Sequence, residues 1–454
     1  MSLKKSFSYI VILLVWACAF FVEPAYRAIL LMLLLVGLLV TEALPVITST
    51  VLVLCMLPLT GTVSAIPEIF SGFSNPVIFF MIASFGIAAA FTKVPLTKRI
   101  LYGMLKICGD SSEKVLLAIM ICECLVSSVM SNVPSCLIFL AIGKQFLELY
   151  SDEAEKKRTG KIVMIGVTYA SMIGGMLTPV GSSINILALN ILEKYNGETV
   201  SFLQWMGISV PVVLLILPMA WFVLIKIYKP GAIDAEAKKI FCDNLGVEKK
   251  ISVQEKKVIV IMIGMILLWV LSSWICKINI ILVALCGAVL FQMPGIEVID
   301  SKEFLKSIKW EAIFLVATVM SLGNLIVGAV PAETLLNLIY MPTHMPGAVL
   351  IVAIMVFVGL VFLPVAPSLV TIVSPLIFAV ALSGGFSVRA LVIVCAMCAG
   401  NCYLFPLDTV CLMTYSEGYY RIRDMFKISV LIQAWIVFVM TIFVPIFGRA
   451  VGLI

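Results

Sequence analysis

The sequence predicts an all-α polytopic membrane protein, an inverted repeat with about eleven transmembrane helices and two re-entrant hairpins. Three observations lead to this prediction. Of the 454 residues, 62% are hydrophobic and only 12% are charged, whereas a soluble domain has about 25% charged residues. Apolar runs of membrane-spanning length recur without the alternating polarity of a membrane β-barrel. Short polar stretches interrupt the most apolar of these runs.

The expected crossings follow the apolar runs in chain order, and they cover residues 8–22, 28–41, 46–60, 76–92, 162–194, 207–225, 258–275, 279–293, 311–330, 386–415 and 428–446. The run after Lys4 and Lys5 is expected to remain as the first helix, because no convincing small-residue cleavage site follows it. Segments 113–148 and 345–382 are too long for one crossing, and each has Pro and Ser near its middle. Each is therefore expected to form a hairpin that returns to the side from which it entered.

The positive charges support this topology. Only five of the 31 Lys and Arg residues fall outside, namely Arg27, Lys194, Lys277, Arg389 and Arg449. A full crossing in place of either hairpin would invert every later loop and remove this asymmetry. The protein is therefore expected in the plasma (inner) membrane, with its N-terminus in the cytoplasm and its C-terminus outside.

Weak internal similarity suggests a duplication. Val77–Phe80 matches Ala312–Leu315, and Pro134-Ser135 matches Pro367-Ser368 in the same order along the chain. The expected organisation is a first inverted repeat over 1–228 with hairpin 113–148 and broken helix 162–194, a cytoplasmic linker loop over 229–257, and a second inverted repeat over 258–454 with hairpin 345–382 and broken helix 386–415.

Two polar stretches in the first half are the strongest functional signal, Ser131–Ser135 and Thr178–Asn185. Backbone that leaves a helix inside a bilayer is tolerated only where it faces protein or a polar cavity, so such breaks commonly mark a transporter's binding site. The amides of Asn132 and Asn185 can offer an oxygen to a cation and an N–H to a carboxylate, and neighbouring serines add hydroxyls. The alternative for such residues is hydrogen bonding between packed helices.

These stretches resemble the motifs of the divalent anion:sodium symporter family. Ser131-Asn132-Val133 looks like the Ser-Asn-Thr motif of the first hairpin, and Gly181–Asn185 looks like the motif of the first broken helix. The ending Gly418–Met425 is also of the family type. The resemblance implies a homodimeric secondary transporter of a small divalent anion, which moves its substrate by an elevator mechanism. C4-dicarboxylates, related di- or tricarboxylates and sulfate are the implied substrates, coupled to sodium or protons.

The resemblance also implies the site residues. The substrate would be held by Ser131, Asn132, Val133, Ser182, Ser183, Pro367, Ser368 and Thr409. The cation, sodium if the protein is sodium-coupled, would be held by Ser131, Asn132, Gly181, Asn185 and Asp408. The second half departs from the family pattern, since Leu363–Ser368 lacks a Ser-Asn-Thr and Phe405–Val410 lacks a Pro-Pro-Asn. The second sodium site of the family therefore lacks its usual motif here.

Asp408 is the most distinctive single residue. A carboxylate at the bilayer centre costs about 2.5–3.5 kcal/mol on insertion scales, so it is expected to have a function. It is expected either to carry a proton or to replace the lost second-site sodium ligands. The alternative is a structural carboxylate that caps a half-helix or bonds to Asn401 or Thr409.

Other classes of function are less well supported. With His344 as its single histidine, the chain has no His-based metal site or catalytic triad, and we expect neither an enzyme nor a cofactor. The expected partners are the anion, the coupling cation and the lipid bilayer, with no nucleic acid. A cation/proton antiporter of the same superfamily that uses Asp408 is the alternative. A channel usually has rings of pore-lining charges or a filter of carbonyls, and the expected inverted repeat with two hairpins argues against one.

Overall fold

The computed structural model describes residues 12, 15, 17–18, 20–41, 43–63, 65–107, 109, 111–233, 235–248, 250–275, 278–329, 342–362, 365–401, 403–404 and 408–454. Every regular element in these ranges is a helix, as predicted. The predicted first crossing, 8–22, falls mostly outside the described residues.

The helices of the first half and the linker are α2 (Pro24–Thr41), α3 (Val46–Leu59), α4 (Ile66–Ile69), α5 (Pro76–Lys93), α6 (Leu96–Ile107), α7 (Ser112–Met130), α8 (Asn132–Leu147), α9 (Glu153–Met176), η1 (Pro179–Gly181), α10 (Ser183–Asn196), α11 (Phe202–Tyr228) and α12 (Ala235–Asn244). Those of the second half are α13 (Val253–Leu271), α14 (Ile280–Leu290), α15 (Ser301–Ser307), α16 (Trp310–Ala329), α18 (Met345–Phe362), α19 (Ala366–Gly384), α20 (Val388–Ala399), α21 (Thr409–Ser416) and α22 (Ile422–Ala450).

Several helices are long and apolar enough to cross a membrane. Within the described ranges these are α5, α11, α18, α19 and α22, with a sixth span if α15 and the first part of α16, bent by 55°, count as one. Shorter apolar helices, including α3, α8, α14 and α20, accompany them. The chain is thus a polytopic membrane protein, and the predicted number of about eleven crossings stays a prediction.

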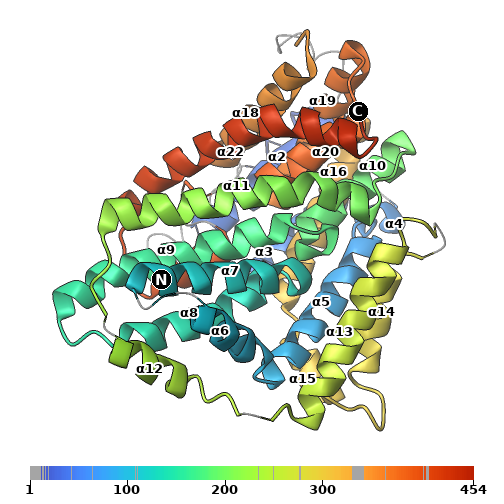
Figure 1. Ribbon diagram of the computed structural model, residues 1–454. Coiled ribbons are helices and arrows are strands. Elements are labelled where there is room, and N and C mark those ends of the chain that lie inside the picture. The colour runs from blue at the N-terminus through green and yellow to red at the C-terminus, as the bar shows by residue number, and fades with distance from the viewer. Residues whose placement is uncertain are drawn as a thin grey trace.

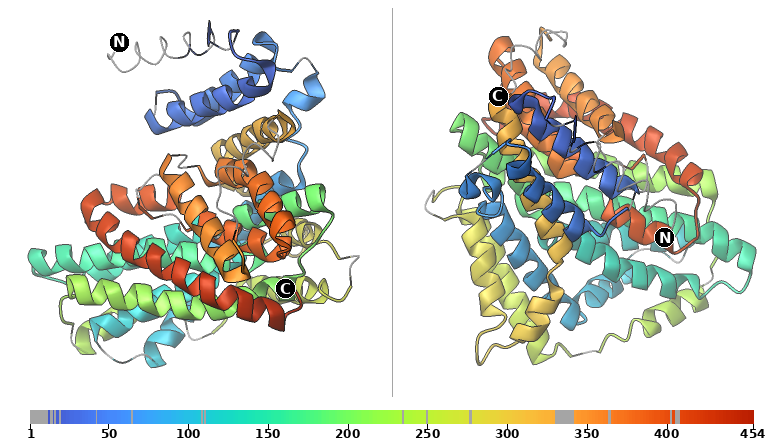
Figure 2. Two further views of the ribbon diagram at one scale, coloured as in Figure 1. Left: turned by 90° about the horizontal axis from the view of Figure 1, so that it is seen from above. Right: turned by 180° about the vertical axis from the view of Figure 1, so that it is seen from behind.

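The apolar side chains form two cores. The smaller core joins α2, α3 and α16 through residues such as Leu31, Leu35, Val53, Val319 and Leu322, all fully buried. The larger core joins the remaining long helices. Figure 2 shows α2 and α3 (blue) as a layer on one side of the molecule, and Figure 1 shows α9, α11 and α22 side by side across it. The polar breaks lie within the larger core.

The packing of the second half repeats that of the first. α7 packs on α8 and α9, as α18 packs on α19 and α20. α3 packs on α16, and α14 packs on α5. α10 packs on α19 and α20, whereas α21 packs on α8 and α9. The last helix of each broken segment therefore lies against the paired helices of the other half.

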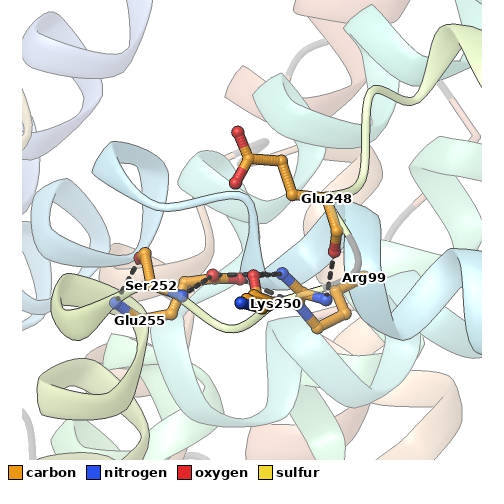
Figure 3. Close-up of polar contacts among 5 residues, drawn as sticks. All are labelled: Arg99, Glu248, Lys250, Ser252 and Glu255. Atoms are coloured by element: carbon orange, nitrogen blue, oxygen red, sulfur yellow. Dashed lines mark hydrogen bonds and ion pairs between the residues drawn. The ribbon is translucent and has the colours of Figure 1, made fainter.

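An ion pair fastens the linker to the first half (Figure 3). The Arg99 guanidinium on α6 binds both carboxylate oxygens of Glu255, at 2.9 and 3.1 Å, and donates to the carbonyls of Glu248 and Lys250. Glu255 also caps α13 with Ser252. Hydrogen bonding to Arg99 lowers the pKa of the Glu255 carboxyl, so the pair contributes stability at neutral pH that is lost when acid protonates Glu255.

Candidate functional site

The first helix pair turns at a residue with unusual backbone geometry. Ser131 separates α7 from α8 with φ 75° and ψ 158°, a region that is populated almost only by glycine. Its N–H donates to the Ser127 carbonyl at 3.2 Å, and its own carbonyl accepts from the N–H of Ser135 at 3.4 Å. Val133, in the first turn of α8, is half-buried. Strained backbone of this kind persists only where the surrounding structure holds it, and it is common at ligand sites.

The side-chain amide of Asn132 lies among oxygen atoms of three segments. With its nitrogen toward them, it donates to the carbonyls of Ser171 and Gly181, both at 3.2 Å, and to the Ser127 hydroxyl at 3.1 Å. The Ser127 hydroxyl donates to the Ser171 carbonyl, and the Ser171 hydroxyl donates to the Asn132 carbonyl, each at 2.7 Å. Rotating the amide by half a turn would put its Oδ1 beside the same carbonyls, an oxygen environment that suits a hard cation.

Glycines allow this close approach of α9 to the turn. A Cβ at Gly175 would lie 2.2 Å from Asn132 Oδ1, and a Cβ at Gly174 would lie 2.4 Å from the Cys124 carbonyl oxygen. A Cβ at Gly181 would lie 2.8 Å from the carbonyl oxygen of Gly175. No larger residue fits at these positions unless the backbone moves, so the glycines set the distance between the two polar stretches.

Asn185 holds the break between α9 and α10. It is 1% exposed, and its amide nitrogen donates to the carbonyls of Gly175 at 2.8 Å and Thr178 at 3.0 Å. The Gly175 carbonyl lies in the last turn of α9, where it has no helical partner, and the Thr178 carbonyl also accepts from the N–H of Gly181 at 3.2 Å. Both amide N–H groups are thus used within the protein, and only the Asn185 oxygen remains for a ligand. That oxygen can coordinate a cation but cannot donate to an anion.

Two side chains of α11 satisfy the other carbonyls at the end of α9. The indole N–H of Trp205 donates to the Met176 carbonyl at 2.8 Å, and the Ser209 hydroxyl donates to the Leu177 carbonyl at 2.6 Å. Buried carbonyls without partners would be costly in a membrane interior. The first break is therefore held open by dedicated partners rather than by water.

α10 begins at this break with two serines, Ser182, which is buried, and Ser183. Ser182 is its N-cap, and the Ser182 hydroxyl accepts from the N–H of Ile184 at 3.3 Å. Ser183, the first helical residue, is half-buried. The N-terminus of a helix carries a partial positive charge and free N–H groups, which favour an anion.

The second break repeats part of this arrangement. The Asn401 amide donates to the Met397 carbonyl at 2.8 Å where α20 ends, as Asn185 does for α9. Ser429 on α22 donates to the Tyr403 carbonyl at 2.6 Å. Ser429 lies seven residues into α22, and Ser209 lies seven residues into α11. α11 and α22 thus each place a serine, at the same distance from the helix start, on a carbonyl near a break.

Asp408 is the N-cap of α21. Its Oδ1 accepts from the N–H of Val410 at 2.9 Å, so the capping alternative, rather than a bond to the side chain of Asn401 or Thr409, describes the structure. Asp408 is half-buried, and α21, the helix that it caps, packs on α8 and α9. Through α8, the carboxylate is placed beside the first helix pair.

Ser368 lies at the start of α19, where the second helix pair turns. It is fully buried, and its hydroxyl has no hydrogen-bond partner among the described residues. Leu363 and Pro364 lie outside the described residues. A buried hydroxyl without a protein partner is available to a ligand or water.

A small cavity of about 50 Å³, with a mixed polar and apolar lining, lies where α10 and α19 meet α16. Polar residues of its lining are Asn75, Asn190, Lys194, Asn324, Thr371 and Ser374. The Asn324 oxygen accepts from Lys194 and from the Tyr195 hydroxyl, each at 3.1 Å, and Asn75 donates to Asn190 at 2.8 Å. The sequence analysis did not identify this cavity, because its residues come from four separate segments.

The structure links the predicted residues of the first half through hydrogen bonds and close contacts. Asn132 reaches Gly181 directly, and Asn185 binds Gly175, which lies against Asn132. Pro367, Ser368 and Thr409 form no side-chain hydrogen bond with these residues within the described ranges. Sequence reasoning missed the supporting hydroxyls Ser127, Ser171 and Thr178, which sit within a few turns of the breaks.

Comparison with known proteins gives three findings. Residues 35–400 match the model of a family described as citrate transporters. The sodium-dependent dicarboxylate transporter SdcS of Staphylococcus aureus strain NCTC 8325 is 27% identical over 252 residues, covering 52% of this chain and 47% of the relative. SdcS of strain MRSA252 gives the same values, so this chain spans about half the length of the relatives it matches.

The third finding concerns the fold. The crystal structure of the Alcanivorax borkumensis YdaH transporter matches with a TM-score of 0.50 and 13% identity, over 84% of this chain and 86% of that chain. The matched proteins are all transporters, and none is an enzyme.

Proposed function

Because the chain belongs to the citrate transporter family, we propose that it is a secondary active transporter of a small di- or tricarboxylate, coupled to sodium, in the plasma membrane. Membership of this family agrees with the resemblance to divalent anion:sodium symporters that the motifs predicted. The sodium-dependent dicarboxylate relative supports both the carboxylate and the cation in this proposal. Which acid is carried is for experiment to decide.

The cluster around Asn132 is the observation that carries the proposal. We place the cation among Asn132 Oδ1, the carbonyls of Ser171 and Gly181, and the Asn185 oxygen, with Ser131 at the turn. Without a cation, the Asn132 nitrogen satisfies these carbonyls. When a cation binds, a half-turn of the amide exchanges three hydrogen bonds for an oxygen ligand, so the site is closed by protein in both states.

The anion is proposed to lie at the N-terminus of α10. Ser182 and Ser183 offer hydroxyls there, and Ser131, Asn132 and Val133 form the facing turn. Pro367 and Ser368 would approach from the second helix pair and Thr409 from α21. A bound cation beside this position would offset the negative charge of a carboxylate, so the two ligands would bind cooperatively.

The architecture proposed for transport is an inverted repeat over 1–228 and 258–454. The exchanged packing of α10 and α21, and the matched roles of Ser209 and Ser429, support it. The proposal also includes about eleven crossings and two re-entrant hairpins, with the N-terminus in the cytoplasm and the C-terminus outside. The carrier is proposed to be a homodimer that works by an elevator mechanism.

A cation/proton antiporter remains the second candidate. It is favoured by the position of the Asp408 carboxylate, at the start of α21, which packs on α8. In that case Asp408 and Asn132 would handle the ions and no organic anion would bind.

Uptake into proteoliposomes tests these candidates. Radiolabelled succinate, citrate and sulfate are supplied under an inward sodium gradient and separately under an inward proton gradient. We expect sodium-driven uptake of a di- or tricarboxylate, inhibited by the unlabelled acid. Protein-free liposomes are the control. If monodisperse, thermally stable protein takes up none of the three anions under either gradient, the antiporter replaces the carboxylate carrier.

A further inference from the structure

Glu123 is a fully buried carboxylate that the proposed site does not use. It lies on α7, two turns before Ser131, with no exposed surface. Neither of its carboxylate oxygens has a hydrogen-bond partner in the part of the chain that the structure describes. A buried ionised carboxylate without a partner is strongly disfavoured, whereas the neutral acid is tolerated far more easily.

The groups around Glu123 do not supply a positive charge. Two thiols lie near it, that of Cys124, the next residue of its own helix, and that of Cys136, on α8. The helices α5, α6, α9 and α11 and the turn η1 also pack on α7, and none of their described residues adds a charge that acts on this carboxylate. Ser135 contacts only the backbone carbonyl of Glu123, at 3.4 Å.

A second glutamate that is buried among the described residues shows what an ionised carboxylate receives in this fold. Glu255 is 1% exposed, and it binds Arg99 through both oxygens and accepts from the N–H of Ser252. Glu123 has none of these partners within the described ranges. The contrast indicates that Glu255 is built to be charged and Glu123 to be neutral.

We propose that Glu123 is a proton-binding site of the transporter, occupied by a proton in this conformation. The inference rests on the proposed function, because it assigns a coupling proton to the same carrier. Glu123 takes a proton from water on one side when movement of α7 and α8 exposes it, and releases it on the other side. The proton partly offsets the charge of the carboxylate substrate, in addition to the cation near Asn132.

Glu123→Gln tests this site, because glutamine mimics the neutral acid and cannot exchange a proton. The matched control is Glu113→Gln, on the first turn of the same helix, where the residue is exposed. Proteoliposomes with a pH-sensitive dye inside report proton entry while labelled citrate or succinate uptake is counted. We expect a fixed ratio of protons to anions in the wild type and in Glu113→Gln, and a loss of substrate-driven proton entry in Glu123→Gln.

The readout is the ratio of protons to anions rather than the rate of uptake, so a variant that transports slowly can still be tested. An unchanged ratio in Glu123→Gln overturns the inference while leaving carboxylate transport intact. Infrared spectroscopy supplies a test that needs no transport. The wild type should show the C=O band of a protonated carboxylic acid that is absent from Glu123→Gln and present in Glu113→Gln. If no such band is lost in Glu123→Gln, Glu123 is ionised and the proposal is wrong, whatever the carrier transports.

Discussion

The helix after the first break begins at Ser182, which caps it with a hydroxyl, whereas the helix after the second break begins at Asp408, which caps it with a carboxylate. In both cases the side chain accepts a hydrogen bond from the N–H two residues later, Ile184 at 3.3 Å and Val410 at 2.9 Å. The two N-caps therefore share their hydrogen-bond geometry but differ in charge.

Because the two N-caps differ in charge, the two breaks can bind ligands of different charge. A helix N-terminus attracts an anion, and a carboxylate at its N-cap already supplies the negative charge. The N-terminus of α10, with Ser182 and Ser183, is therefore left free for a substrate anion. The N-terminus of α21 repels a second anion when Asp408 is ionised, and it suits a cation or a proton.

The largest effect should come from breaking the close packing at the first site. Gly175→Ala would place a Cβ 2.2 Å from Asn132 Oδ1, so the amide must move away from the carbonyls of Ser171 and Gly181. We expect uptake to fall on the order of 100-fold, the scale seen when a positioned group is displaced by about 1 Å. Gly264→Ala on α13 is the control, because no atom lies within 4 Å of its Cβ position. Equal uptake by the two variants would remove Asn132 from the site.

A large effect on stability is expected from the residue that closes the first break. Asn185→Ala leaves the Gly175 and Thr178 carbonyls without their amide partner, and should lower the free energy of unfolding by about 2–4 kcal/mol. Asn196→Ala, at the end of the same helix, is the control and should lower it by less than about 0.5 kcal/mol. Denaturant unfolding in detergent measures both. A loss equal to that of the control would show that water, rather than Asn185, satisfies these carbonyls.

The breaks themselves could be predicted from the sequence, because their signals are local. Gly, Pro, Ser and Asn inside an apolar run mark where a helix ends, and the structure ends α7 at Met130 and α9 at Met176, beside the two polar stretches. The partners of the freed carbonyls could not be predicted. Trp205 and Ser209 come from a later helix, and nothing in the sequence around them indicates the atoms they reach.

The acidic residues show the same limit. Asp408 was expected to be functional; the structure shows that it caps α21, and its part in transport stays a prediction. Glu123 has no motif around it, and only its three-dimensional surroundings show that it has no partner in the described ranges. Whether the segments 113–148 and 345–382 return to the side they entered stays a prediction, since pairing of helices does not place them relative to a bilayer.

Changing the charge of the N-caps Ser182 and Asp408 tests whether the two breaks bind different ligands. Ser182→Asp keeps a capping acceptor and adds a negative charge at the N-terminus of α10. The anion then loses about 0.3–1 kcal/mol of favourable interaction with the helix dipole, so its KM should rise about 2- to 5-fold. Ser182→Asn, an uncharged cap, is the control. Asp408→Asn should leave the anion KM near the wild-type value and change the dependence on sodium or pH. If Ser182→Asp and Ser182→Asn have equal KM values, the anion does not bind at this end of α10.

The smallest change in stability is expected at the start of the second helix pair. Ser368→Ala removes a hydroxyl that bonds no described residue, so the free energy of unfolding should stay within about 0.5 kcal/mol of the wild type. Ser135→Ala is the matched control from the first helix pair, where the hydroxyl donates to the Glu123 carbonyl, and it should lose about 1 kcal/mol. If Ser368 contacts the substrate, its variant raises the anion KM while its stability is unchanged. A variant that alters neither quantity would leave the first break, with the N-terminus of α10, as the whole anion site, and would make the second helix pair a structural copy without a ligand.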